Sequence, residues 1–158
     1  STLSSSSAAS DVYKRQDIAL LVCPQSGRMA FFPQEPAVPD CRPPLASPSR
    51  PRHALPAGAC DTHCHVFGPA DVFPYAEGRS YTPPDAPYAK MAALHAHLGV
   101  QRAVVVQANC HGSDHAALLD ALAQSQGRYR GVALLGADAT AASVRQLHEG
   151  GVLSLIHI

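Results

Sequence analysis

The sequence carries no excess charge of either sign: its 158 residues include 12 lysines and arginines and 12 aspartates and glutamates. A strongly basic surface is what attracts nucleic acid or an anionic membrane, so the balance argues against both and leaves a small molecule as the expected partner. No apolar run is long enough to span a bilayer. The five cysteines lack the dense spacing of a disulfide scaffold, which favours a reducing, cytoplasmic compartment.

Two hexapeptides near the ends of the chain are related through the genetic code. One choice of codons for LSLIHI, residues 153–158, encodes DVYKRQ, residues 11–16, when the opposite strand is read. The shared DNA resembles the end of a transposase-based sequencing adapter. We therefore interpret residues 1–16 and 153–158 as adapter-derived and not as native sequence. On this interpretation the natural C-terminus is missing; the alternative is a chance match between two natural termini.

Residues 17–56 form an extension that is rich in proline and serine from residue 33 onward and ends in RPPLASPSRPRHALP, residues 42–56. Proline has no amide hydrogen for a strand ladder and disfavours a helical conformation in the residue before it. We expect this segment to be extended or disordered. The pattern then changes, and residues 57–152 have the composition of a folded α/β unit.

Short apolar segments of strand length recur along residues 57–152. CDTHCHVFG, residues 60–68, is expected to form a first strand followed by a long loop rich in turn residues. RAVVVQ, residues 102–107, and RGVALLG, residues 130–136, are continuous apolar runs of the kind buried in parallel sheets. Val152 is expected to begin a fourth strand.

Segments with helical periodicity alternate with these strands. In residues 88–98, apolar side chains at Met91, Leu94 and Leu98 recur at spacings of three and four, which predicts a helix with these residues on its buried face. We expect Asp85 to cap this helix at its N-terminus.

A second helix is predicted over residues 114–126, with Ser113 as its cap and Leu118, Leu119 and Leu122 as its core face. A third helix is predicted within TAASVRQLHEGG, residues 140–151.

Alternating strands and helices with short connections predict right-handed crossovers and a parallel α/β sheet. Periodicity alone does not distinguish a closed barrel from an open sheet.

The first predicted strand carries a His-x-His motif. Because side chains alternate along a strand, His63 and His65 should share one face, with Thr62, Cys64 and Val66 on the other. Two imidazoles at the end of a strand can bind a divalent metal that activates water. Without a metal they can donate hydrogen bonds to a carbonyl oxygen as negative charge develops on it. A pair of solvated polar residues is the plain alternative.

LPAGACDTHCHVFGP, residues 55–69, and the segment from FPYAEGRSYTPPD to QANCHGSDHAALLDAL, residues 73–122, resemble a known group of enzymes. The chain is similar, from about residue 55 to 152, to the N-terminal part of the 2-pyrone-4,6-dicarboxylate lactonase branch of the amidohydrolase superfamily. The resemblance implies a TIM (β/α)8 barrel of which the chain holds about three βα units. It also implies hydrolysis of a carboxylated cyclic ester, in the degradation of aromatic compounds, with no metal required.

The resemblance also implies roles for particular residues. His63 and His65 would face the scissile carbonyl, and Tyr81 in the following loop would help to hold the substrate. Gln107, Asn109 and His111, after the second strand, would line the pocket. The general base and the carboxylate-binding arginines would lie beyond residue 152, so we expect the chain as given to be unstable and inactive.

Two other functions stay open at this point. In a metal-dependent amidohydrolase or decarboxylase on the same barrel, His63 and His65 would bind zinc or manganese. In a non-catalytic binding module the His-x-His motif would be incidental, and replacing either histidine would change no turnover. The remaining metal ligands, if any, would lie on later strands.

Overall fold

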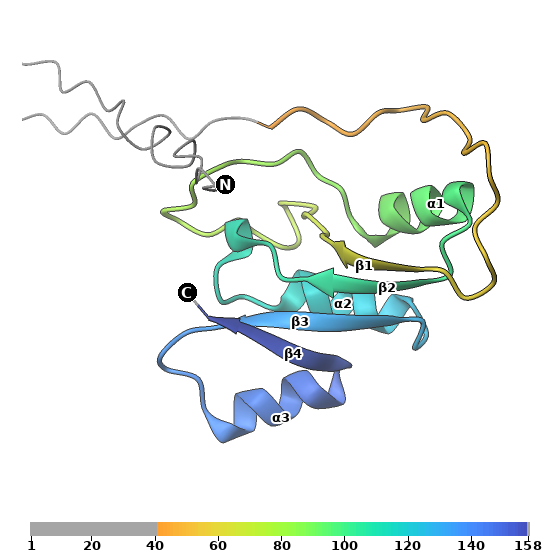
Figure 1. Ribbon diagram of the computed structural model, residues 1–158. Helices are drawn as coiled ribbons and strands as arrows, with labels where there is room; N and C mark the ends of the chain where they lie inside the picture. Colours follow the sequence, from red (N-terminus) through yellow and green to blue (C-terminus); the bar gives the residue numbers. More distant parts are fainter. Residues whose placement is uncertain (1–40, 158) are drawn as a thin grey trace, which may run out of the picture. The chain divides into compact units, whose positions relative to one another are not determined.

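The computed structural model of the chain describes residues 41–157 (Figure 1). The expected adapter segment, residues 1–16, and the first part of the proline-rich extension lie outside this range. Residues 41–56 carry no helix or strand. The elements that follow are β1 (Cys60–Cys64), α1 (Tyr88–Leu98), β2 (Arg102–Val106), the 3-10 helix η1 (Asn109–His111), α2 (Ala116–Gln124), β3 (Tyr129–Leu135), α3 (Ala141–Glu149) and β4 (Val152–His157).

The four strands form one parallel sheet in the order β1-β2-β3-β4, which confirms the predicted parallel α/β architecture (Figure 1). Each strand is joined to the next by a segment that contains an α-helix. The carboxyl ends of all four strands therefore meet at one edge of the sheet, and β1 places the end of the His-x-His motif there. None of the helices in residues 41–157 has the length and apolar character needed to cross a membrane.

The α-helices pack on one face of the sheet, where a single hydrophobic core joins them to the strands. The strands contribute alternating residues, as in β2, where Ala103 and Val105 are buried in this core. Leu118 and Leu122 of α2 lie opposite them, as predicted, whereas Leu119 is only partly buried. Small and β-branched side chains on the strands allow the helices to approach closely.

Two of the predicted N-terminal caps are wrong. The N-cap residue of α1 is Pro87, with no side-chain cap, and the Asp85 carboxylate instead accepts hydrogen bonds within the preceding loop. Helix α2 begins at Ala116, whose N–H donates to Asp114 Oδ1 at 2.9 Å rather than to Ser113. Aspartate and serine also form such bonds in turns, so sequence alone does not decide which role they take.

The buried stripe of α1 is also shifted from the prediction. Met91 is buried as expected, but Leu94 is 40% exposed and the buried position is that of His95, only 3% exposed. A polar ring can be buried when its nitrogens have hydrogen-bond partners, and both ring nitrogens of His95 are bonded.

The predicted third helix and fourth strand are confirmed. Thr140 and Ser143 form a reciprocal capping box that begins α3. Strand β4 begins at Val152, as predicted, and continues through residues 153–157, which lie in the segment interpreted as adapter-derived. The pairing of these residues with β3 does not decide their origin, and that interpretation stays a prediction.

Candidate active site

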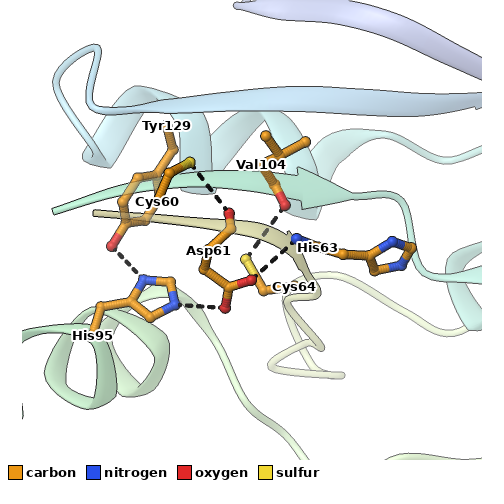
Figure 2. Close-up of polar contacts among 7 residues, drawn as sticks. All are labelled: Cys60, Asp61, His63, Cys64, His95, Val104 and Tyr129. Atoms are coloured by element: carbon orange, nitrogen blue, oxygen red, sulfur yellow. Dashed lines mark hydrogen bonds and ion pairs between the residues drawn. The ribbon is translucent and has the colours of Figure 1, made fainter. Parts of the chain in front are cut away.

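Strand β1 contains a bulge that separates its side chains into two groups. Asp61 pairs with Ala103 and Cys64 pairs with Val105, so three steps along β1 match two steps along β2. Asp61 and Cys64 consequently both face the helix side of the sheet, and the His63 ring points away from them (Figure 2). Bulges re-aim side chains in this way and are frequent beside active sites.

The predicted convergence of the two imidazoles is confirmed. The ring centroids of His63 and His65 lie 5.0 Å apart, with the rings at 77° to each other. His65 Nδ1 donates a hydrogen bond to the Val106 carbonyl oxygen at 2.9 Å, since that oxygen can only accept. This bond ties the His65 ring to the end of β2 and leaves Nε2 as its available nitrogen.

His111 connects the loops that follow β1 and β2. Its ring is buried, with Nε2 accepting from the Gly68 N–H at 3.3 Å and Nδ1 near the Pro74 carbonyl oxygen, also at 3.3 Å. The Tyr75 ring lies against it, with centroids 5.0 Å apart. Both ring nitrogens therefore contact the backbone of the β1–α1 loop, so His111 holds that loop against the segment that follows β2.

The other predicted pocket residues differ in exposure. Gln107 is buried, and its side-chain amide donates to the carbonyl oxygens of Gly112 and Asp114, at 3.2 and 2.7 Å. Asn109 is exposed at the start of η1. Tyr81 is partly buried, and this burial raises the pKa of its hydroxyl, with the nearby Cys110 thiol contributing further. The Tyr81 hydroxyl accordingly stays protonated at neutral pH.

A polar network that the sequence did not predict, buried at His95 and Tyr129 and partly exposed at Asp61, lies on the helix side of β1 (Figure 2). His95 Nε2 is 3.3 Å from Asp61 Oδ2, and His95 Nδ1 is 2.8 Å from the Tyr129 hydroxyl. Asp61 Oδ1 accepts from the backbone N–H of His63 at 3.0 Å. The available signals were an aspartate two residues before His63 and a histidine four residues after Met91 on the same helix face.

The sequence model for the family described as Amidohydrolase matches residues 60–156. The chain belongs to the amidohydrolase family. The matched range begins at β1, includes every described helix and ends within β4. It therefore contains the His-x-His strand and both loops described above.

Named members of the amidohydrolase family are similar to this chain. A 2-pyrone-4,6-dicarboxylate hydrolase of Comamonas testosteroni is 53% identical over 107 residues, which are 68% of this chain and 35% of that protein. A 4-sulfomuconolactone hydrolase of Rhizobium radiobacter is 44% identical over 115 residues, 73% of this chain and 38% of the other. The chain thus spans little more than a third of the length of these relatives.

A solved structure agrees with this membership. The crystal structure of an Agrobacterium tumefaciens protein in its apo form superimposes with a TM-score of 0.60 at 27% identity. The superposition covers 69% of this chain and 38% of the other. The arrangement of strands and helices in residues 41–157 therefore occurs within a larger folded protein.

In the metal-dependent alternative, His63 and His65 would hold a divalent metal. A catalytic zinc site uses three protein ligands. Within residues 41–157, the one group of three potential ligand atoms that lie within 4.8 Å of one another is Asp61, Cys64 and His95, and it includes neither His63 nor His65. The described residues therefore do not complete a metal site at the pair.

The Cys64 thiol faces the Asp61 carboxylate on the helix side, and its reactivity follows from that position. Burial, then the negative charge of Asp61, raises its pKa from 9.0 to about 12. The thiol remains protonated below that pH, so little nucleophilic thiolate forms near neutrality.

We expect iodoacetamide at about pH 8 to alkylate Cys64 at least ~30-fold more slowly than the exposed Cys60, after allowing for the greater intrinsic nucleophilicity of a high-pKa thiolate. Because both cysteines lie in one tryptic peptide, residues 53–79, fragment-ion mass spectrometry of that peptide over a time course measures the two rates separately. Equal labelling of the two cysteines in the folded protein would contradict the raised pKa of Cys64.

Proposed function

We propose that the protein, in its complete form, hydrolyses a carboxylated cyclic ester of the 2-pyrone-4,6-dicarboxylate type through attack of water on the lactone carbonyl. The observation that carries this proposal is the pair of imidazoles at the carboxyl end of β1, His63 and His65, with ring centroids 5.0 Å apart. The two named relatives that share this part of the chain are both hydrolases, of a pyrone dicarboxylate and of a sulfomuconolactone.

The tautomer of His65 limits what each imidazole can contribute. Because Nδ1–H of His65 is bonded to Val106, the neutral ring presents a lone pair at Nε2, and only the imidazolium presents an N–H there. The His63 ring has no hydrogen bond to another described residue, so it can turn an N–H toward the carbonyl oxygen in either protonation state. We assign His63 as a donor to the developing oxyanion and the imidazolium of His65, through Nε2–H, as the second donor to the same oxygen.

The loop residues are proposed to surround the substrate. Tyr81, whose hydroxyl stays protonated, and the exposed Asn109 would donate hydrogen bonds to substrate oxygens. Gln107 and His111, with their side chains bonded to loop backbone, would shape the same pocket wall. Hydrogen-bond donors of this kind suit a substrate rich in carboxylate and carbonyl oxygens.

We further propose that residues 57–152 are the N-terminal part of a TIM (β/α)8 barrel. Helices on one face of a parallel sheet, as seen here, are the arrangement of that barrel, whereas an open doubly wound sheet has helices on both faces. Residues beyond 152 of the natural protein would supply the general base and cationic groups for the substrate carboxylates. We place the enzyme in the cytoplasm, with no metal requirement.

The test is an assay of the complete protein with 2-pyrone-4,6-dicarboxylate, in which loss of the pyrone ultraviolet absorbance follows ring opening. We expect turnover, and we expect the same rate after dialysis against a chelator. Activity lost on chelation and restored by zinc or manganese would favour the metal-dependent alternative. Absence of turnover with this compound and with related carboxylated lactones would contradict the proposal.

A further inference from the structure

A side-chain hydrogen bond reaches the backbone of β1 within its bulge. Between Asp61 and Cys64 the register with β2 shifts, and the N–H of His63 lies in that interval. The bond to this N–H comes from a side chain, Asp61 Oδ1, at 3.0 Å. In this conformation the His63 ring points away from the helix side (Figure 2). The hydrogen bond from the His63 N–H to the carboxylate two residues earlier stabilises it.

The Asp61 carboxylate is itself held from two other elements. Its Oδ2 can only accept, so the proton between it and His95 lies on His95 Nε2, 3.3 Å away. His95 Nδ1 is then a lone pair that accepts from the Tyr129 hydroxyl at 2.8 Å. His95 and Tyr129 are both buried, on α1 and β3 respectively, which limits alternative partners for either group.

We propose that Asp61 is a positioning residue for the His63–His65 pair, and that His95 and Tyr129 hold its carboxylate in place. The part of this proposal that concerns turnover rests on the proposed function. Both Asp61 oxygens are engaged, one by the backbone of the functional strand and the other by the helix packed behind it. Tyr129 donates to His95, and His95 and the His63 amide both donate to the Asp61 carboxylate.

The alternative role for the same side chains is to bind a cation. Ligand atoms of Asp61, Cys64 and His95 lie within 4.8 Å of one another, a spacing that a bound cation could use. That role would require the lone pair of His95 on Nε2, which is the opposite tautomer from the one in the hydrogen-bonded network. The two roles therefore make different predictions for the same variants.

The experiment compares Asp61→Ala, Asp61→Asn and His95→Phe in the complete protein, with Leu118→Ala as the matched control. Leu118 lies on α2 in the hydrophobic core and makes none of the network's hydrogen bonds, so its truncation lowers stability without removing one of those bonds. The readouts are NMR-detected exchange of the His63 amide proton, and kcat and KM for the lactone, all measured well below the melting temperature of each variant.

We expect Asp61→Ala to expose the His63 amide and to lower kcat about 100-fold with little change in KM, the effect expected of misplacing a catalytic group by about 1 Å. Asp61→Asn should recover most of kcat, because its amide oxygen can still accept from His63 while its NH2 donates to the other His95 tautomer. His95→Phe should lower kcat about tenfold, as loss of an outer supporting partner does elsewhere. Leu118→Ala should leave both the exchange rate and kcat unchanged.

Protection of the His63 amide that persists in Asp61→Ala would overturn the proposal, as would an equal loss of kcat in Leu118→Ala. Stoichiometric zinc in the purified protein, lost in Cys64→Ser and His95→Phe but retained in His63→Ala, would replace it with a metal site. If the wild type hydrolyses no lactone, the proposed function fails, and the exchange rate of the His63 amide still decides whether Asp61 positions the strand.

Discussion

Replacing His63 with alanine in the complete protein is expected to lower kcat/KM for the lactone by about 10²- to 10³-fold, the range measured when one donor to a developing oxyanion is removed. His63 is exposed and contributes nothing to the hydrophobic core, so the free energy of unfolding should change by no more than about 0.5 kcal/mol. His65→Ala should lower kcat/KM to a similar extent. The double variant should lose less than the product of the two single losses, because the rings act at one oxygen.

Steady-state kinetics beside thermal melting separates this effect from a loss of fold. His148→Ala is the matched control, since His148 is an exposed histidine in the last turn of α3. It should show wild-type kinetics. Wild-type turnover in both His63→Ala and His65→Ala would assign the two rings to the incidental role expected of a binding module.

The 158-residue chain expressed alone is expected to show no cooperative thermal transition and no lactone hydrolysis. Within the described residues, β1 and β4 each pair on one side only, so the sheet has two open edges. Leu153 and Leu155 on β4 are 64% and 40% exposed. Open edges and exposed leucines on a terminal strand favour association with other chains over a stable monomer.

Circular dichroism during heating, with size-exclusion chromatography, tests this expectation against the complete protein as the reference. We expect a broad, non-cooperative change and soluble aggregates from the short chain, and a sharp transition from the complete protein. A cooperative melt of a monomeric short chain would show that four strands suffice for folding. Residues 57–152 would then have to be regarded as a self-contained α/β module.

Local sequence patterns predicted most of the fold because they report local interactions. The apolar run of β2 and the spacing of Leu118 and Leu122 in α2 each identified an element that the structure contains. The same patterns failed where a polar side chain had a choice of partners. Asp85 and Ser113 were expected to cap helices. In the structure the Asp85 carboxylate accepts a hydrogen bond within a loop, and the first N–H of α2 donates to Asp114.

The sequence by itself determined that the chain alternates strands and helices and that His63 and His65 lie together on one strand face, because side-chain alternation requires only the strand. Tertiary structure decided what supports that strand. Asp61, His95 and Tyr129 are separated by 34 residues at each step, and they meet only when α1 packs against β1 and β3. His111 and Gly68 likewise come together only when two loops fold over one edge of the sheet. A hydrogen bond between distant residues depends on packing geometry, which no local periodicity encodes.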